Sequence, residues 1–444
     1  MTAAPSLADT LPRHWQLKRL KFIARVQTGV AKGKDHADAD TVEVPYLRVA
    51  NVQDGYLALD DVATMAVPVA DLERYRLQPG DVLMNEGGDF DKLGRGHVWH
   101  GQIDPCIHQN HVFAVRPHGV SPEWLNAWTG SAPAQFYFMG RAKQSTNLAS
   151  ISSSNVMELP VPVPPPEEQV ARVAFIARET SRIDALIAKK TRFIALLREK
   201  RQALIAQAVT RGLDPDVAMK DSGVDWLGRM PVHWRIVPLK WIAAIGNGST
   251  PSREEPDFWV GGTIPWLTSS VVNSGEVSNA EEFVTEKALT ACHLPIINPP
   301  AVLVGLTGQG RTRGMATVLR TRATISQHLA FIKPKELEIS VGYLARFFEM
   351  AYPRIRYDSE GAGSTKGAVT CEQLGEHPVL VPPPREQSLI VEHISQSVTA
   401  MNELAQTSQR SVALLKEHRS ALITATVTGQ IDIGQSSDPT NCAP

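Results

Sequence analysis

Two long stretches of the chain carry a hydrophobic pattern typical of paired helices. Residues 167–209 and 385–427 contain no proline or glycine over some 43 residues each. In each stretch, positions spaced alternately three and four residues apart are apolar at eight of eleven sites. The pattern predicts one continuous helix per stretch, with a seam that faces a partner helix. The seam residues we expect are Ile183, Ile187, Ile194, Leu197, Leu204, Met401, Val412, Leu415 and Leu422.

The chain ahead of each long stretch alternates short apolar runs with turns. Runs such as residues 41–49 and 301–306 have β-type composition and are separated by glycine-rich and proline-rich segments. This pattern predicts a mixed globular domain before each helix. Three consecutive prolines, at 164–166 and at 382–384, then block both a helix and a central strand. Each long helix is therefore expected to begin directly after its prolines.

The two halves of the chain are copies of one another. Residues 11–29 return as residues 230–248 with eight of nineteen positions identical, and residues 196–214 return as residues 414–432 with ten of nineteen identical. The shift between matching segments stays between 217 and 220 residues along the chain. The sequence therefore contains two homologous globular domains and two homologous helices.

This duplication predicts the fold class and the domain organisation. We expect an α+β fold whose two long helices pair as an antiparallel coiled coil, in a pseudo-twofold molecule with the globular domains at opposite ends. The alternative, in which each helix packs only on its own globular domain, is disfavoured by the matching seams. The expected boundaries are 1–163 for the first globular domain, 164–214 for the first helix, 215–381 for the second globular domain, 382–432 for the second helix and 433–444 for a disordered tail.

Composition excludes several classes of protein. The 444 residues carry 45 Lys and Arg against 46 Asp and Glu, a net charge of −1, so any basic surface has to be local. Four cysteines without a C-x-x-C pair argue against a disulfide framework and a thiolate zinc site. No apolar run approaches the length of a membrane span, and the first residues lack a signal-peptide pattern. We expect a cytoplasmic protein.

No convincing catalytic or metal site is present in the sequence. The histidines between positions 97 and 111 have zinc-like spacing, but the second repeat keeps only His328, opposite His111. Asn298-Pro299-Pro300-Ala301 lacks the aromatic residue that adenine methyltransferases stack on the target base. Neither glycine-rich stretch has phosphate-loop spacing, and there is no convincing nuclease triplet. We expect a binding protein with no metal site and no catalysis of its own.

Local charge indicates where nucleic acid would bind. Residues 305–322 hold four arginines and no acidic residue, and neighbouring glycines let the backbone approach a groove. The matching segment of the first repeat, residues 85–99, instead combines Lys92 and Arg95 with three acidic residues. A protein that recognises two different DNA sequences needs two copies of one fold that carry different side chains in the DNA-binding loops. The candidate DNA contacts are Lys32, Lys34, Lys92, Arg95, Arg141, Lys143, Asn147, Arg311, Arg313 and Lys366.

Taken together, these motifs resemble the specificity subunit of type I restriction-modification systems. The resemblance rests on Asp221-Ser-Gly-Val-Asp-Trp-Leu-Gly228 leading into Pro231-Val-His-Trp234, on the two glycine-rich loops, and on the Pro-Pro-Pro-x-Glu-Gln starts of both helices. It spans nearly the whole chain except for the N-terminal residues before Leu11 and the tail after Asp432. It implies two target-recognition domains, each reading one half of a split DNA site, with the paired helices setting the gap.

The resemblance also implies partners. Two modification subunits that methylate adenine would dock on the helices and domains, restriction subunits would join them, and the complex would act on double-stranded DNA without a membrane. S-adenosylmethionine, ATP and magnesium would belong to those subunits and not to this chain. The residues alone leave two other classes open. One is an autonomous sequence-specific DNA-binding regulator, and the other is a fused methyltransferase-endonuclease, whose catalytic motifs are missing.

Overall fold

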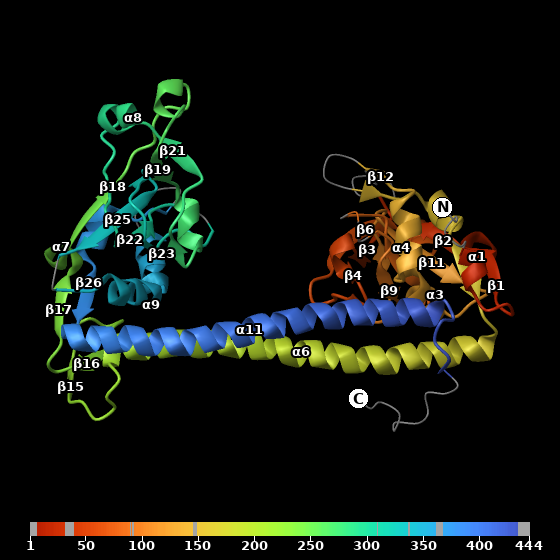
Figure 1. Ribbon diagram of the computed structural model, residues 1–444. Helices are drawn as coiled ribbons and strands as arrows, with labels where there is room; N and C mark the ends of the chain where they lie inside the picture. Colours follow the sequence, from red (N-terminus) through yellow and green to blue (C-terminus); the bar gives the residue numbers. More distant parts are fainter. Residues whose placement is uncertain are drawn as a thin grey trace. The chain divides into compact units, whose positions relative to one another are not determined.

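The chain folds into two compact units in a computed structural model, which describes residues 7–31, 40–88, 90, 93–144, 149–308, 310–335, 338–360 and 367–433. The first unit takes residues 1–191 and 409–444, and the second takes residues 192–408. Each unit combines a globular α+β domain with one segment of each long helix (Figure 1). None of the helices among these described residues is long and apolar enough to cross a membrane. The expected tail lies outside the described residues from position 434 onward.

The first globular domain is built around a four-stranded sheet. Its elements are α1 (Leu7–Thr10), β1 (Gln16–Arg19), η1 (Leu20–Phe22), β2 (Ala24–Thr28), β3 (Thr41–Leu47), η2 (Val49–Asn51), β4 (Val52–Gln53), β5 (Tyr56–Leu57), β6 (Ala63–Pro68), α2 (Val69–Tyr75), β7 (Val82–Asn85), β8 (Gly87–Gly88), β9 (Gly96–Val98), β10 (Ile107–His108), β11 (Val112–Pro117), α3 (Pro122–Thr129), α4 (Ala132–Met139), β12 (Lys143–Gln144), β13 (Ala149–Ser150), α5 (Ser153–Met157) and β14 (Pro160–Val163). The central sheet has the order β2-β11-β7-β9, and β1 pairs antiparallel with β14.

The second globular domain repeats this frame. Its elements are β15 (Met219–Asp221), β16 (Arg229–Pro231), β17 (Arg235–Pro238), α7 (Leu239–Ile242), β18 (Ala243–Asn247), η4 (Pro256–Phe258), β19 (Ile264–Leu267), η5 (Ser269–Asn273), β20 (Glu276–Val277), β21 (Glu282–Val284), α8 (Glu286–Ala291), β22 (Ala301–Gly305), β23 (Ala316–Leu319), β24 (Thr324–Ile325), β25 (Leu329–Pro334), α9 (Val341–Glu360), α10 (Cys371–Glu376) and β26 (Pro378–Val381). The central sheet has the order β18-β25-β22-β23-β20. The apolar runs expected to be strands are strands in both domains.

Both long stretches are continuous helices, α6 (Pro166–Arg211) and α11 (Pro384–Val427), which confirms their predicted extent. In the first unit they pair antiparallel, because Asp184 of α6 meets Arg419 of α11 at 3.0 Å, whereas the earlier residue Arg172 meets the later residue Thr426 at 3.1 Å. In the second unit, the end of α6 and the start of α11 share one hydrophobic core. The seam residues are buried or half-buried. That core also includes the globular domain, so the helices pack on each other and on the domain at once.

One side-chain arrangement starts both long helices and accounts for the repeated Pro-Pro-Pro-x-Glu-Gln motif. Glu168 accepts a hydrogen bond from the indole of Trp15 at 3.0 Å, and Glu386 accepts one from the indole of Trp234 at 2.6 Å. The glutamine after each glutamate donates to the carbonyl of the first proline of the run, at 2.9 Å in both units. The helix start is thereby fixed to the first segment of the domain, which lies more than 150 residues earlier in the chain.

Each repeat also keeps a glycine just after the first strand of its central sheet. A Cβ at Gly29 would lie 2.0 Å from the carbonyl oxygen of His108, and a Cβ at Gly248 would lie 1.6 Å from that of Ile325. Only glycine lets the two backbones approach so closely. This contact fastens the end of the first sheet strand to the neighbouring strand segment in both domains.

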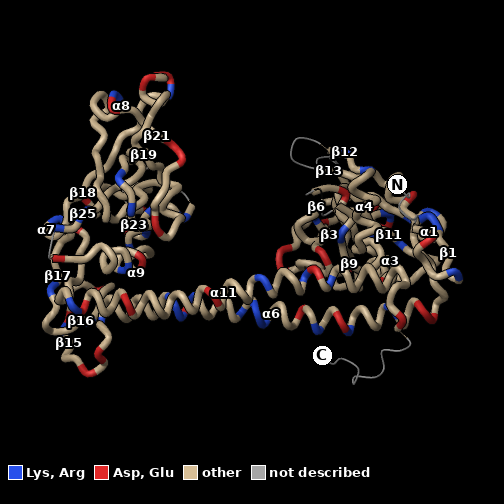
Figure 2. Tube along the Cα trace, viewed as in Figure 1, with Lys and Arg blue, Asp and Glu red and all other residues tan. Residues whose placement is uncertain are grey.

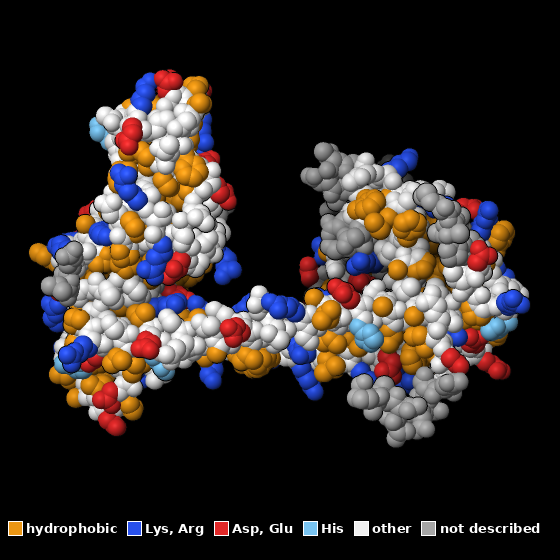
Figure 3. Space-filling view, in the orientation of Figure 1, with side chains coloured by type: hydrophobic (Ala, Val, Ile, Leu, Met, Phe, Trp, Pro, Cys, Tyr) orange, Lys and Arg blue, Asp and Glu red, His pale blue; other side chains and the backbone are white. Residues whose placement is uncertain are grey.

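The long helices carry charged residues of both signs along their length (Figure 2). Apolar side chains interrupt this charged surface (Figure 3). Leu186 and Leu404 occupy matching positions of the repeat and are 47% and 51% exposed; Leu196 and Leu414 also match and are 44% and 64% exposed. These leucines lie off the seam, at positions where a helix that faced only water would carry polar residues.

Two buried histidines make the stability of the fold depend on pH. Burial lowers the pKa of His108 in the first unit and of His377 in the second unit to about 4. Because an unfolded histidine titrates near 6.5, both side chains are neutral in the folded protein, and stability is lost as the pH falls from about 6.5 towards 4. Each histidine should cost about 2 kcal/mol at pH 5.

We expect His377→Phe to reduce this acid sensitivity in the second unit. The ring stacks on Phe348 with centroids 6.1 Å apart, and its Nε2 has no hydrogen-bond partner among the described residues, so a phenyl ring fits the site. Denaturant unfolding at pH 7 and pH 5 measures the effect, with the exposed His118→Ala as the control. Equal losses of stability in His377→Phe and the wild type would contradict the assignment.

Candidate nucleic-acid interface

A loop rich in arginine and glycine, residues 306–315, joins β22 to β23 in the second unit and is called the basic loop here. The side chain of Arg311 is exposed at its tip, while its carbonyl oxygen accepts a hydrogen bond from the Tyr352 hydroxyl at 2.9 Å. Arg356 donates to the carbonyl of Gly310. Helix α9 therefore holds the loop by its backbone and leaves the Arg311 guanidinium at the surface.

Arg313, in the same loop, is placed differently. It is only 6% exposed, and its Nη2 donates to Oε1 of Glu360 at 3.0 Å. A Cβ at Gly367 would lie 1.9 Å from its Nη1, so the surrounding backbone encloses the guanidinium. Arg313 ties the loop to the end of α9, and its side chain would have to leave this site to reach DNA.

The matching loop of the first unit, residues 86–95, is called the mixed loop because it combines acidic and basic residues. Arg95 is half-buried, and its Nη1 lies 3.3 Å from Oδ2 of Asp54. Gly94 has a φ of 70°, and a Cβ there would lie 2.4 Å from the ring of Phe138, so only glycine fits. The two loops share a frame but present different side chains.

One histidine that both repeats keep, His111 in the first and His328 in the second, contacts these loops. Nδ1 of His111 lies 2.8 Å from Oε2 of Glu86, the first residue of the mixed loop. Nδ1 of His328 lies 3.0 Å from the hydroxyl oxygen of Thr307 in the basic loop. This histidine has a structural role in both units, which agrees with its retention when His97, His100 and His108 have no histidine at the matching positions of the second repeat.

A second candidate segment lies beside the mixed loop. In the sheet with the order β12-β13-β8, the strand β13 separates Lys143 of β12 from Gly87 and Gly88 of the mixed loop. Arg141 is exposed, and its guanidinium lies 3.9 Å from the centre of the Tyr137 ring. In the second unit, the amide of Val369 donates to the carbonyl of Leu306 at 2.8 Å, which brings the matching segment to the basic loop. The structure thus places the segment that carries Lys143 beside the mixed loop, and the matching segment at Val369 beside the basic loop.

Five of the ten candidate contacts lie outside the described residues. These are Lys32, Lys34, Lys92, Asn147 and Lys366. Of the other five, Arg141, Lys143 and Arg311 are exposed, Arg95 is half-buried and Arg313 is buried. The exposed candidates lie in the turn between α4 and β12, in β12 itself and in the basic loop.

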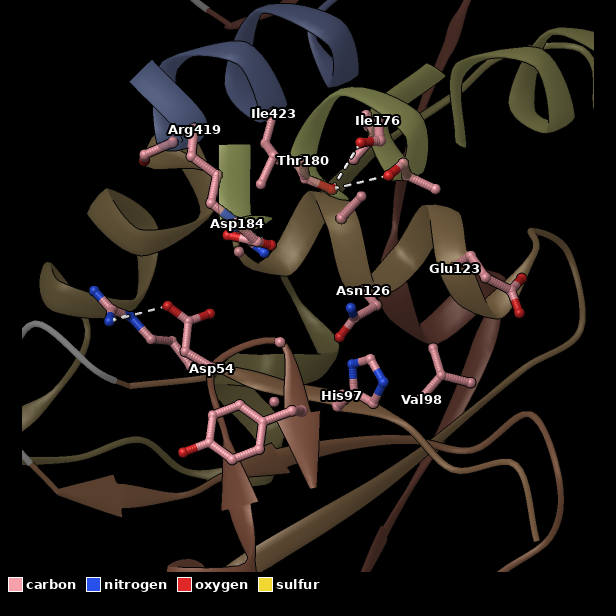
Figure 4. Close-up of a pocket in the computed structure, with 18 of the residues that line it drawn as sticks. Asp54, His97, Val98, Glu123, Asn126, Ile176, Thr180, Asp184, Arg419 and Ile423 are labelled. Atoms are coloured by element: carbon pink, nitrogen blue, oxygen red, sulfur yellow. Dashed lines mark hydrogen bonds and ion pairs between the residues drawn. The ribbon is translucent and has the colours of Figure 1, made fainter. Parts of the chain in front are cut away.

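A groove of about 1430 Å³ opens in the first unit between the globular domain and the helix pair. Figure 4 shows Asp54, His97 and Glu123 on the domain side and Thr180, Asp184 and Arg419 on the helix side. Three acidic and three basic side chains line it, and two of the acidic ones are ion-paired with arginines in the groove itself. The balanced charge does not favour a phosphate backbone, so the groove is set apart from the candidate interface.

Histidine, cysteine and acidic side chains are the candidate metal ligands and nucleophiles among the described residues. No group of three or more histidine, cysteine or acidic side chains among them is placed to hold a metal ion. Burial raises the pKa of the Cys106 thiol to about 12, so it stays protonated and is a poor nucleophile. Burial, with a smaller contribution from the charge of His100, lowers the pKa of His97 in the groove.

Sequence reasoning missed the residues that support the basic loop. Tyr352, Arg356 and Glu360 lie on one helix, more than 40 residues after the loop in the chain. No local motif marks them, because their role depends on how α9 packs against β22 and β23. The glutamate-tryptophan pairs at the helix starts did have a signal, since both partners recur in the two repeats at nearly the same spacing.

Comparisons with known proteins agree with this architecture. A protein-family model described as type I restriction modification DNA specificity domain matches residues 231–413. The chain is 21% identical over 429 residues to the putative type I restriction enzyme MjaX specificity subunit of Methanocaldococcus jannaschii, covering 95% of each protein. It is 22% identical over 296 residues to the type I restriction enzyme EcoR124I/EcoR124II specificity subunit of Escherichia coli, covering 66% of this chain and 67% of the relative.

Solved structures show the same fold at low sequence identity. A chain from work on complex assembly and conformational transition of the type I restriction-modification system is 17% identical, with a TM-score of 0.72, covering 95% of this chain and 99% of that one. The HsdS subunit from Thermoanaerobacter tengcongensis is 18% identical, with a TM-score of 0.52, covering 95% of this chain and 98% of that one. Both similarities extend over the two repeats and both long helices.

Proposed function

We propose that this chain, which belongs to the family of type I restriction-modification specificity subunits, is the DNA-reading subunit of such a complex. Each globular domain reads one part of a bipartite site in double-stranded DNA. The chain itself is not an enzyme; it positions adenine-methyltransferase and restriction subunits on the DNA. We propose residues 1–163 and 215–381 as the two target-recognition domains, in a protein that acts in the cytoplasm.

One observation carries the proposal. The two domains share a sheet frame and a loop at the same position, yet the basic loop exposes Arg311 while the mixed loop holds Arg95 against Asp54. Arginine forks onto guanine, and acidic side chains accept from the amino group of cytosine. A duplicated frame with different side chains at its loops supports two readers of different sequences.

The partner subunits supply the chemistry. S-adenosylmethionine, ATP and magnesium belong to them in this proposal. Two methyltransferase subunits dock on the helices and domains of this chain, and restriction subunits join them. The exposed leucines at matching positions of α6 and α11 support docking of the same protein on both helices, because an apolar surface repeated twice fits two copies of one partner.

Methyl transfer should require the partner subunit. The purified chain incubated with labelled S-adenosylmethionine and DNA should transfer no label, since Asn298-Pro299-Pro300-Ala301 lacks the aromatic residue that would stack on a flipped adenine. Adding the cognate methyltransferase subunit should give labelled adenine within a bipartite sequence. Transfer by the chain alone, after removal of every partner, would contradict the proposal.

We expect Arg311→Ala to affect the second half-site only. If Arg311 binds guanine through both nitrogens, its loss should cost about 1 to 3 kcal/mol and relax selectivity at one position. If it binds a phosphate, all sequences should weaken alike and the salt slope should fall by about one. The assay uses the assembled methyltransferase, DNAs altered in each half-site and a salt series.

Two further variants make this experiment specific. Arg385→Ala removes an exposed arginine at the start of α11 and should leave binding unchanged. Arg313→Ala removes the ion pair between the buried Arg313 and the exposed Glu360, and should lower the stability of the second unit as well as its DNA binding. Wild-type affinity and selectivity of Arg311→Ala on every DNA would show that the basic loop does not face DNA.

A further inference from the structure

An exposed aromatic side chain occupies the same position in both repeats. Phe22 of η1 is 65% exposed and Trp241 of α7 is 66% exposed, at a sequence shift of 219 residues. In each case, the neighbouring residues of the same helical turn enter the core. Leu20 and Leu239 are both 0% exposed. Single exposed aromatic residues are common, but two at equivalent positions of a duplicated fold indicate a shared purpose.

Each aromatic ring has a lysine–glutamate pair beside it. Nζ of Lys21 lies 5.3 Å from the centre of the Phe22 ring and 2.5 Å from a carboxylate oxygen of Glu158. In the second unit, Lys240 lies 6.0 Å from the centre of the Trp241 ring and pairs with Glu376, the repeat equivalent of Glu158. We call each set of three residues an aromatic spot: Phe22, Lys21 and Glu158 in the first unit, and Trp241, Lys240 and Glu376 in the second.

The aromatic spot of the second unit lies at the opposite end of the central sheet from the basic loop. Helix α7 leads into β18, whose first residue, Ala243, pairs with Pro334 at the end of β25. The basic loop leaves β22 at Gly305, which pairs with Leu329 at the start of β25. Pro334 and Leu329 are five residues apart on β25, which corresponds to about 17 Å along an extended strand. Figure 1 shows α7 and β23 on opposite sides of the domain.

The first unit has the same geometry. η1 leads into β2, whose first residue, Ala24, pairs with Pro117 at the end of β11. The mixed loop leaves β7 after Asn85, which pairs with Val112 at the start of β11. The separation along the strand is again five residues, or about 17 Å. In both units, a DNA duplex on the loop side would leave the aromatic spot uncovered.

We propose that each aromatic spot anchors one copy of the same protein partner, the methyltransferase subunit, on one unit. This inference rests on the proposed function. The reading loops differ between the units, whereas the aromatic spots are alike, which fits one partner bound twice. DNA is a poorer fit, because each spot carries a carboxylate that repels phosphate; in the first unit Glu158 pairs with Arg19 at 2.7 Å as well as with Lys21. A protein pocket that accepts an aromatic ring and has a polar rim suits the spot.

The test is a titration of the cognate methyltransferase subunit against the full chain. Phe22→Ala and Trp241→Ala should each weaken one of the two binding events about tenfold, and the double variant should weaken both. Native mass spectrometry reports how many copies bind. Phe22→Trp and Trp241→Phe should bind as the wild type does, because the repeats use either ring. Tyr357→Ala removes a 71% exposed aromatic residue of α9 that belongs to neither aromatic spot, and serves as the matched control.

The outcomes separate this inference from the proposed function. If the double variant binds two methyltransferase copies as the wild type does, the aromatic spots are not the anchor of this partner. The proposed function would be unaffected by that result. If the double variant assembles normally but its complex binds DNA more weakly, the anchoring role is also contradicted, because the aromatic spots would then contact DNA. Failure of the wild-type chain to bind the methyltransferase at all would overturn both. Thermal unfolding of each variant should match the wild type, because these rings lie mostly outside the core.

Discussion

Inserting seven residues into α6 alone, between Thr191 and Arg192, should abolish assembly with the methyltransferase subunits. Each long helix runs unbroken along the chain from one unit into the other, and in each unit its segment packs against the other helix. Seven residues lengthen one helix by about 10 Å. The packing of α6 on α11 can then be kept in both units only if the seven added residues bulge out of the helix pair. The helix pair therefore loses buried apolar contacts.

The matched control inserts seven residues into both helices, the second insertion lying between Ser408 and Gln409. Both seams keep their register, so the chain should fold and assemble. The gap in the recognised DNA site should then grow by about three base pairs, because one base pair spans about 3.4 Å along the duplex. Circular dichroism, mass photometry of the complex and methylome sequencing measure these effects. Normal assembly with only one helix lengthened would show that the helices are not a paired spacer.

Replacing Arg172 by alanine should destabilise the first unit by about 3 to 5 kcal/mol. Arg172 is 5% exposed, and its Nη1 donates to the carbonyls of Thr426 and Ile431 at 3.1 and 3.0 Å. Its Nη2 lies 2.7 Å from Glu168. Without the guanidinium, the end of α11 loses its attachment to α6 and buried oxygen atoms lose their partners.

Calorimetry and hydrogen exchange of the first and second units measure this change. The first unit should unfold earlier in Arg172→Ala, while the second unit should be unaffected. The control is Arg178→Ala, which removes a 52% exposed arginine paired with Glu179 and should cost less than about 1 kcal/mol. A loss in Arg172→Ala no larger than in Arg178→Ala would contradict the structural role of Arg172.

The sequence predicts the long helices well for a physical reason. A seam repeated over some 43 residues, without glycine or proline, leaves no competing structure for those segments. The observed helices begin and end within two residues of the predicted stretches. The short β-type runs were also identifiable, because glycine and proline mark the turns between them.

Burial of individual arginines was not predictable from the sequence. Arg311 and Arg313 are two residues apart in the same glycine-rich loop, yet one is exposed and the other is 6% exposed. The difference arises from Glu360, at the far end of α9. That helix itself lacks a clear signal, because Pro353 lies inside it. Contacts made through tertiary packing leave no local pattern.

The boundaries of the compact units were also not predictable from the sequence. The proline runs mark where each helix begins, whereas the units divide within the helices, after residues 191 and 408. Each helix packs part of its length on one globular domain and the rest on the other. A periodic seam does not show where the packing partner changes, since both partners require the same apolar stripe.

The central claim is that one chain reads two different half-sites. Methylome sequencing of cells that express this chain with its cognate methyltransferase subunit tests it most directly. The account predicts methylated adenine in a single bipartite motif with two different specific halves and a gap of fixed length. Arg311→Ala should change only the half read by the second domain. A continuous motif without a gap, or a change in both halves on mutation of Arg311, would contradict the account.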